Sequence, residues 1–157
     1  MRCDLHSLAV TITVAALGAA VPAMAQAPAK PLQVQETNIE GFTAELTSVT
    51  QSDGVLTVRI RFRNTSDKAR RVPLVTHPND IDKYYVVAGS TKLLPLRDSE
   101  KVPLMSALGS GGNLEPELRP GTSFLFWAKF PAPPAGTKKI AIYTVPTPPF
   151  EDVQVPQ

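Results

Sequence analysis

Residues 55–64, Val-Leu-Thr-Val-Arg-Ile-Arg-Phe-Arg-Asn, contain the strongest structural pattern in the chain. Apolar side chains alternate with polar ones, the apolar set being Leu56, Val58, Ile60 and Phe62 and the polar set Thr57, Arg59, Arg61 and Arg63. A period of two places the two sets on opposite faces of a β-strand. Burial of four such apolar side chains contributes roughly 6 to 12 kcal/mol before the entropy of folding is subtracted. A shift of one residue would bury three arginines, so the pattern predicts a central strand of fixed register.

The residues before this stretch predict its first partner. Residues 42–49 alternate in the same way, with Phe42, Ala44 and Leu46 on one face. Asp53-Gly54 lies between the two stretches, and this dipeptide readily adopts the positive φ angles of a tight hairpin turn. The sequence therefore predicts an antiparallel pair, and residues 33–37 read as a short edge strand beside it.

The residues after it contain further short strands and no convincing helix. Residues 69–75 read as an edge strand because Pro73 cannot donate to a ladder. Residues 122–130 are apolar on both faces, which predicts a central strand. The other strand predictions are a hairpin of residues 84–87 and 92–96 and two final strands, residues 139–145 and 150–155. About seven to nine short strands, separated by regular turn signals, predict an all-β fold, an immunoglobulin-like antiparallel β-sandwich.

Two segments fall outside this pattern. Residues 76–82, Thr-His-Pro-Asn-Asp-Ile-Asp, read as a polar loop between strands. Residues 97–121 are rich in glycine and proline and carry no clear period. An irregular connection of that length is unusual in a compact domain, so we expect it to be either functional or mobile.

The first residues of the chain have the features of a secretory signal peptide. Arg2 precedes an apolar run, residues 8–21, that ends in Ala23-Met24-Ala25, an A-x-A cleavage site. We expect a signal peptide at 1–25, a flexible tether at 26–32 and one domain at 33–157. Retention of residues 1–25 as an uncleaved anchor is the alternative. No later apolar stretch approaches the roughly 20 residues that span a bilayer, so no stable membrane span is expected after cleavage.

Composition restricts the environment and the partners. The only cysteine is Cys3, so cleavage leaves no thiol, and the core alone must hold an exported domain of this size. The formal net charge is +2, and cleavage removes one basic and one acidic residue. A periplasmic or secreted location is expected. Nucleic acid is not an expected partner, because the net charge is small and the aromatic residues lie in apolar strands.

Catalytic and metal-binding patterns are incomplete. His77 is the only histidine outside the expected signal peptide, and the chain contains neither G-x-S-x-G nor S-x-x-K. His77, Asn79, Asp80 and Asp82 offer nitrogen and oxygen ligands but match no zinc or calcium spacing, and Met105 does not complete a copper site. We predict no catalytic residue, cofactor or metal. The alternative hypothesis is a small hydrolase or metal-dependent enzyme centred on His77, with a nearby aspartate and a serine.

A row of arginines is the candidate interaction surface. Arg59, Arg61 and Arg63 share one strand face, and Arg70 and Arg71 are expected on a neighbouring strand. Such a row could meet an acidic envelope protein or an anionic envelope polymer. Alternatively, cross-strand carboxylates and solvent satisfy it. The aromatic residues Trp127, Tyr84 and Tyr85 are predicted as core or core-edge residues rather than as a stacking site for a ligand.

Four turn and strand-start motifs carry a resemblance to a known family. They are Asn-Thr-Ser at 64–66, Leu-Arg-Pro-Gly-Thr at 118–122, Phe-Pro-Ala-Pro-Pro at 130–134 and Pro-Pro-Phe-Glu-Asp-Val at 148–153. Over residues 34–155 the chain resembles the telokin-like, immunoglobulin-like domains of exported bacterial proteins. This resemblance implies a β-sandwich in the cell envelope and offers no catalytic residue. We therefore expect a non-enzymatic binding or interaction module of the bacterial cell envelope, whose contact surface is the arginine row or residues 97–121.

Overall fold

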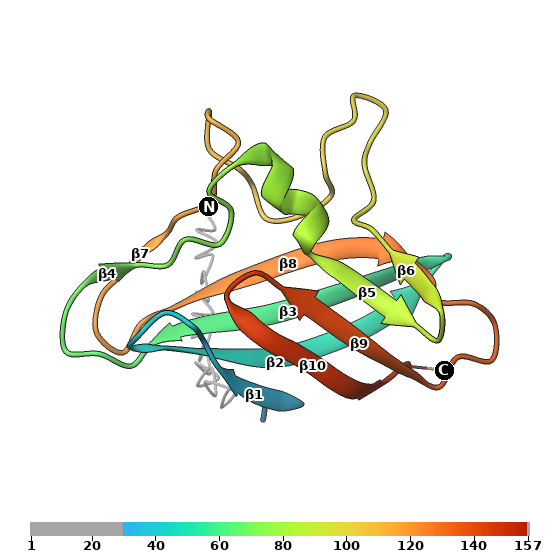
Figure 1. The fold of residues 1–157 in the computed structure, drawn as a ribbon, viewed down its shortest axis with the longest axis horizontal. Helices are drawn as coiled ribbons and strands as arrows, with labels where there is room; N and C mark the ends of the chain where they lie inside the picture. The colour runs from blue at the N-terminus through green and yellow to red at the C-terminus, as the bar shows by residue number, and fades with distance from the viewer. Residues whose placement is uncertain (1–29, 157) are drawn as a thin grey trace, which may run out of the picture.

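The computed structural model describes residues 30–156, which form two antiparallel β-sheets packed face to face and a short strand pair at one end (Figure 1). The first sheet has the order β1 (Gln33–Glu36), β2 (Phe42–Ser52), β3 (Val55–Asn64) and β8 (Ser123–Pro131). The second has the order β10 (Thr147–Gln154), β9 (Lys139–Thr144), β5 (Tyr85–Ala88) and β6 (Thr91–Leu93). The short pair is β4 (Arg70–Arg71) with β7 (Glu117–Leu118), and a 3-10 helix, η1 (Pro78–Lys83), precedes β5.

The predicted all-β antiparallel sandwich is confirmed. Nine of the ten strands correspond to predicted ones, and the tenth is the two-residue β7 inside the long segment 97–121. Strand β3 has the predicted alternation, because its four apolar side chains are at most 1% exposed. Strand β3 pairs with β2 on one side and with β8 on the other. The core therefore lies between the sheets and is organised around β3.

The hairpin between β2 and β3 forms as predicted. Asp53 and Gly54 have φ angles of 51° and 75°, the left-handed region that a tight turn requires. One irregularity follows within the pair, since Leu46 lies opposite Ile60 whereas Ser48 lies opposite Arg59. Thr47 is thus the extra residue of a β-bulge. The bulge restores the inward orientation of the next apolar residue, Val49, which is three positions from Leu46 and 7% exposed.

Aromatic residues join the two sheets. Phe126 of β8 packs edge-on against Phe62, with ring centroids 6.3 Å apart, and its ring is tilted against that of Tyr84, with centroids 5.0 Å apart. The Tyr84 hydroxyl donates a hydrogen bond to the carbonyl oxygen of Leu74. Burial raises the pKa of Tyr84 above its ordinary value, and the nearby Asp80 charge adds to the shift. Tyr84 is therefore a core residue, as predicted.

Two predictions about strands are wrong. Strand β8 is an edge strand rather than a central one, because its outer edge is covered by the irregular residues 96–106 instead of another strand. Of the predicted strand 69–75 only Arg70–Arg71 is regular. Val72, Leu74 and Val75 are all fully buried, and two adjacent buried residues do not fit the two-residue period of a strand.

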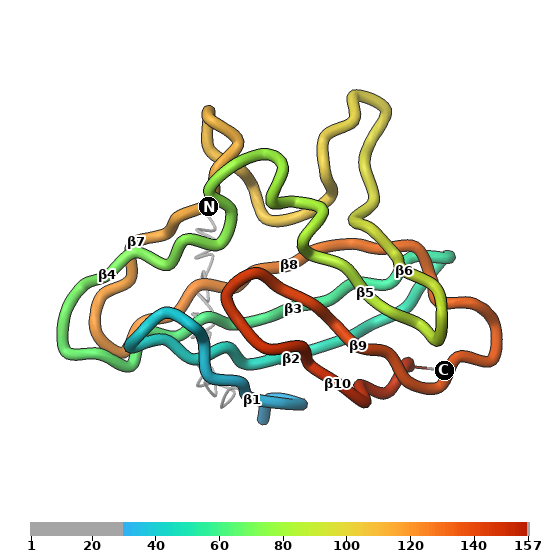
Figure 2. Tube along the Cα trace, viewed as in Figure 1, coloured from blue at the N-terminus to red at the C-terminus, as the bar shows by residue number. Residues whose placement is uncertain are grey.

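The long segment 97–121 forms two projecting loops, seen in yellow and in orange at the top of Figure 2. The first is closed by Asp98, whose Oδ1 accepts hydrogen bonds from the amides of Glu100 and Val102. The second is closed by hydrogen bonds between Gly109 and Asn113 and between Gly112 and Gly109. Leu114 then bridges to Val75. The segment is therefore hydrogen-bonded into the domain rather than a simple open connection.

The expected signal peptide 1–25 and the tether up to residue 29 lie outside the described residues. At the end of the expected tether, the amide of Leu32 donates to the carbonyl oxygen of Leu46 at 2.7 Å, so pairing with β2 begins one residue before β1. Within residues 30–156 no helix has the length and apolar character needed to cross a membrane.

Candidate functional site

The outer face of the first sheet carries a group of cationic and apolar side chains, which we call the basic face. Because the inward residues of β3 and β8 are buried, the intervening residues face away from the core. The strand register places Arg59 opposite Trp127, Arg61 opposite Leu125 and Arg63 opposite Ser123. The basic face consists of Arg59, Arg61, Arg63, Leu125, Trp127 and Lys129.

Arg61 is neutralised within the sheet. Its guanidinium Nη1 lies 3.0 Å from Oε2 of Glu45, the residue directly opposite on β2. The side chains of Arg61 and Glu45 are only 26% and 15% exposed, which screens this pair less than a fully solvated one. For Arg61, the predicted alternative of a cross-strand carboxylate is therefore correct.

Arg59 and Arg63 are exposed, and neither forms an ion pair with another described residue. The bulge places Thr47 and Ser48 beside Arg59, and Thr47 Oγ1 donates to the Arg59 carbonyl oxygen at 3.1 Å. Arg63 has Thr43 opposite it on β2. Both arginines thus lack a carboxylate at the adjacent cross-strand positions, and their charges face solvent.

Apolar side chains lie next to these charges. Leu125 is 48% exposed on β8, and Trp127 is half-buried opposite Arg59. Arginine and tryptophan are enriched among the residues that dominate binding energy at protein interfaces. A surface of this composition can attract an acidic partner and also bury apolar area on contact.

Arg70 and Arg71 are not part of the basic face. They form β4, which pairs with β7 in the separate two-stranded sheet, so the expectation that they lie on a strand beside β3 is wrong. Arg71 pairs with Glu117 at 3.6 Å, and Arg70 Nη1 donates to the Glu40 carbonyl oxygen at 2.6 Å. The turn around Ser66-Asp67 leads the chain away from β3, and the sequence pattern does not show that β4 then pairs with the distant β7.

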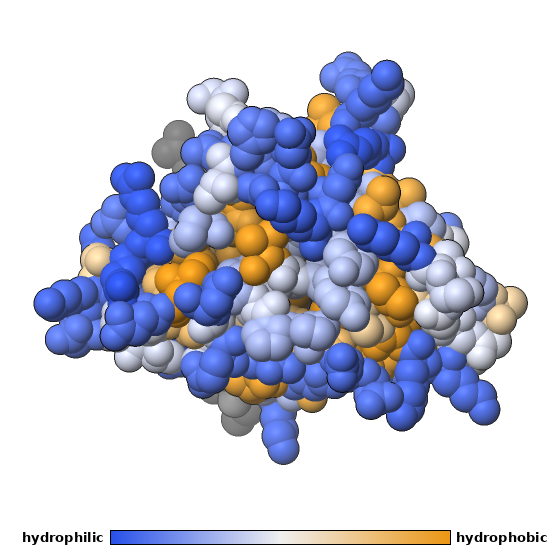
Figure 3. Space-filling view, in the orientation of Figure 1, coloured by the Kyte–Doolittle hydropathy of each residue, from blue (hydrophilic) through white to orange (hydrophobic). Residues whose placement is uncertain are grey.

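The outer face of the second sheet has a different character. Tyr85 and Tyr143 lie opposite each other on β5 and β9 and stack with centroids 4.5 Å apart, and Lys92 Nζ lies 4.0 Å from the Tyr85 ring centroid. Lys139 pairs with Asp152 at 2.9 Å. Figure 3 shows this side of the molecule with small hydrophobic patches among polar residues. Tyr85 follows the buried Tyr84 by one position, which in a strand places it on the opposite face.

His77 caps η1. Its Nδ1 accepts a hydrogen bond from the Asn79 amide at 3.2 Å, and the Asp80 carboxylate accepts one from the His77 amide at 3.0 Å. This is a capping box with Pro78 at the first helical position. No group of three or more histidine, cysteine, aspartate or glutamate residues within 30–156 is placed to hold a metal ion.

Asp80 is the most perturbed carboxylate near His77. The Lys83 ammonium lies 2.8 Å from Oδ1, and Thr76 Oγ1 donates to Oδ2 at 2.7 Å. These contacts, with the amides of Thr76 and His77, hold the pKa of Asp80 well below its usual range. Asp80 is therefore held as the ionised cap of η1.

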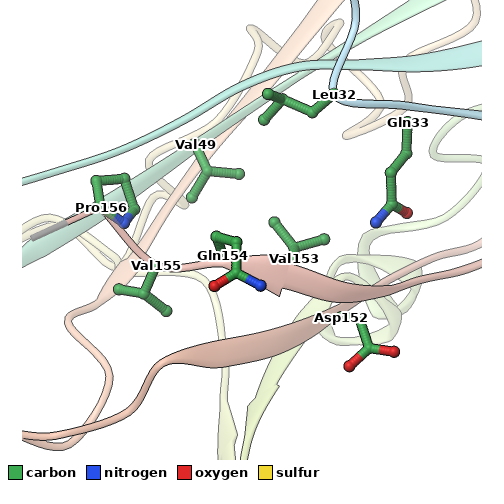
Figure 4. Close-up of a pocket in the computed structure, with 8 residues that line it drawn as sticks. All are labelled: Leu32, Gln33, Val49, Asp152, Val153, Gln154, Val155 and Pro156. Carbon is green, nitrogen blue, oxygen red and sulfur yellow. The ribbon is translucent and has the colours of Figure 1, made fainter.

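A notch of about 370 Å³ opens between the sheets at the end of β10 (Figure 4). Val49 and Val153 point into it, Leu32 lies at its rim, and Val155 and Pro156 close one side. Its only acidic lining residue, Asp152, points away from the opening. The notch offers mainly apolar contact, and its neutral polar groups are the side-chain amides of Gln33 and Gln154.

Comparison of the chain with models of known protein families, with curated proteins and with solved structures found no match. The resemblance to telokin-like domains accordingly stays a prediction.

Proposed function

We propose that this protein is an exported, non-enzymatic binding module of the bacterial cell envelope and that its basic face contacts an acidic partner. The observation that carries the proposal is the exposure of Arg59 and Arg63, without an ion pair to another described residue, beside the exposed Leu125. Unpaired guanidinium groups on a rigid sheet attract carboxylate, phosphate or sulfate groups and can bind them with two hydrogen bonds each.

The position of the face supports a binding role over a purely structural one. Among the described arginines at other sites, Arg70, Arg71 and Arg97 each pair with a carboxylate or a carbonyl of the domain, and the exposed Arg119 lies on the connection between β7 and β8 rather than on a strand. Arg59 and Arg63 instead project from the central strand, whose register is fixed by four buried side chains. The fold thus presents two charges at a defined spacing.

The expected signal peptide supports the location. It predicts export, and the telokin-like resemblance agrees with a place in the cell envelope, where anionic polymers and acidic protein segments are both available. We therefore propose a periplasmic or secreted module whose partner is an acidic envelope protein or an anionic envelope polymer.

The test is a binding titration with two anionic probes, poly-L-glutamate and dextran sulfate. The natural-sequence domain should bind at least one of them, with an affinity that falls as salt is added. Arg59→Glu combined with Arg63→Glu should weaken that binding by about tenfold or more, since each reversal replaces an attraction by a repulsion.

The matched control reverses two charges on the other sheet, Lys92→Glu with Lys139→Glu. It produces the same change in net charge and should leave the affinity within about twofold of the natural sequence if the contact is local. Equal losses in both double variants would show attraction to net charge alone and would reject the basic face as the site.

A further inference from the structure

The outer edge of β8 is unevenly covered. The amide of Asn64 donates to the carbonyl oxygen of Thr122, the residue opposite it. Because hydrogen-bonded pairs alternate along an antiparallel ladder, the even-numbered residues of β8 hydrogen-bond to β3. The odd-numbered residues of β8 therefore direct their N–H and C=O groups away from β3, toward the edge of the sheet. Among them are Leu125, Trp127 and Lys129.

The C-terminal half of this edge is covered by residues 96–106. Ser106 donates its amide to the Trp127 carbonyl oxygen at 2.8 Å and accepts the Trp127 amide on Oγ at 2.9 Å. The Lys129 amide donates to Leu104, and its carbonyl accepts from Leu96, both at 2.8 Å. These four bonds satisfy the edge from Trp127 onward.

The N-terminal half is left open. No hydrogen bond joins the outward N–H or C=O of Leu125 to another residue of the described chain, and the Leu125 side chain is 48% exposed. Proteins usually protect such edges, because an unpaired row of backbone groups can pair with another strand. At the opposite edge of the same sheet, the side-chain amides of Gln33 and Gln35 of β1 donate to the carbonyl oxygens of Glu151 and Pro149 of β10, so β10 lies against that edge.

The side chains beside the open edge indicate what a paired segment would contain. Ser123 is small and lies between the edge and Arg63, so the guanidinium can reach across it toward an added strand about two strand spacings, or about 10 Å, away. Leu125 lies between the edge and Arg61, whose charge is already paired with Glu45. An added strand would therefore place an acidic side chain beside Ser123 and an apolar one beside Leu125, two residues apart.

We propose that the acidic partner of the basic face is an extended polypeptide segment that adds a strand to β8 at Ser123–Leu125. The backbone groups of Leu125 supply hydrogen bonds, Leu125 supplies apolar contact, and Arg63 selects an acidic side chain, the division of roles found in other strand-addition complexes. The inference rests on the proposed function and names the partner class for the same surface.

The experiment uses a short synthetic peptide in which threonines alternate with glutamate, valine and glutamate, in that order. The natural-sequence domain is titrated with this peptide, and NMR follows the binding. Two derivatives carry backbone N-methyl groups, one on the threonines and one on the other residues. Because alternate amides of a strand point to opposite sides, only one derivative can lose its bonds to β8. We expect the derivative that loses these bonds to bind about tenfold more weakly than the parent peptide. Binding of the parent peptide should protect the Leu125 amide from hydrogen exchange.

A variant of the protein gives an independent readout. Leu125→Pro removes the outward N–H at a position where an edge strand tolerates proline. It should lose the peptide, and circular dichroism verifies that it is folded. The methylated peptides test the same bond in the unaltered protein.

The outcomes separate this inference from the proposed function. If both methylated peptides bind as tightly as the parent, or if only dextran sulfate binds, strand addition is wrong although the basic face still binds anions. If Arg59→Glu with Arg63→Glu leaves the binding of every anionic probe unchanged, the proposed function itself fails.

Discussion

The outer faces of the two sheets differ in how their cations are used. On the second sheet, Lys92 lies over the Tyr85 ring and Lys139 pairs with Asp152, so both charges have partners within the domain. On the first sheet only Arg61 has such a partner, while Arg59 and Arg63 face solvent. Both faces belong to the same sandwich, so folding alone does not require free arginines. This difference is the reason for proposing the first face as the contact surface.

The largest expected effect separates the core of β3 from its outer face. Ile60→Ala should lower the free energy of unfolding by about 2 to 5 kcal/mol, because the side chain is fully buried between the sheets. Arg59→Ala, one position away, should change stability by no more than about 0.5 kcal/mol. Urea unfolding of both variants measures this. A loss at Arg59 as large as at Ile60 would mean that the arginine has a structural role.

The next effect concerns the second face. Tyr143→Ala should cost about 1 to 2 kcal/mol, since it removes the stacked partner of Tyr85 and part of the apolar cover of the sheet. Its affinity for poly-L-glutamate or dextran sulfate should remain that of the natural sequence. Tyr143→Phe keeps the stack and serves as the control. Weaker anion binding by Tyr143→Ala, but not by Tyr143→Phe, would place the contact surface on the second sheet and contradict the proposal.

A smaller change should extend the basic face. Glu45→Gln removes the carboxylate that neutralises Arg61 and so adds a third free cation. We expect a stability loss of about 0.2 to 1 kcal/mol and tighter binding of the anionic probes, with a steeper dependence on salt. Isothermal titration at several salt concentrations measures the affinity and its dependence on salt. Unchanged or weaker binding would show that Arg61 does not face the ligand.

The smallest effect concerns Asp80, which lies away from both outer faces. It is a change in how the stability of the fold depends on pH. Because the folded-state pKa of Asp80 is depressed, its contribution to stability is present above the ordinary value of about 3.8 and is lost as the pH falls below it. Asp80→Asn should therefore be less stable near neutral pH and show a flatter loss of stability below pH 3.8. Thermal unfolding across this range, with Asp82→Asn as the control, measures the slope. Equal slopes in the two variants would contradict the capping role.

The parts of the fold that could be predicted are those where one local pattern decides the outcome. The alternation of Leu56 to Phe62 and the turn at Asp53-Gly54 determine a hairpin without reference to the rest of the chain. The bulge at Thr47 also had a signal, the three-residue gap between the apolar Leu46 and Val49. The capping box had one too, since Pro78 follows His77 and Asp80 lies at the third helical position.

The parts that could not be predicted depend on distant contacts. Strand β8 is apolar on both faces, as a central strand would be, yet its neighbour is the irregular chain around Ser106. No period in the sequence reveals that covering. For the candidate site, the arginine row was evident from β3 alone. Which arginines remain free depended on Glu45 and the Thr47 bulge, and the nearby Leu125 came from the pairing of β8 with β3.

The central claim is that the basic face is the contact surface, and mapping the bound surface by NMR on the unaltered protein tests it most directly. Titration with poly-L-glutamate or dextran sulfate should shift the amide signals of Arg59, Arg63 and Leu125 and leave those of β5, β6 and β9 in place. Shifts centred on Tyr85, Lys92 and Tyr143, with β3 and β8 unaffected, would contradict the account.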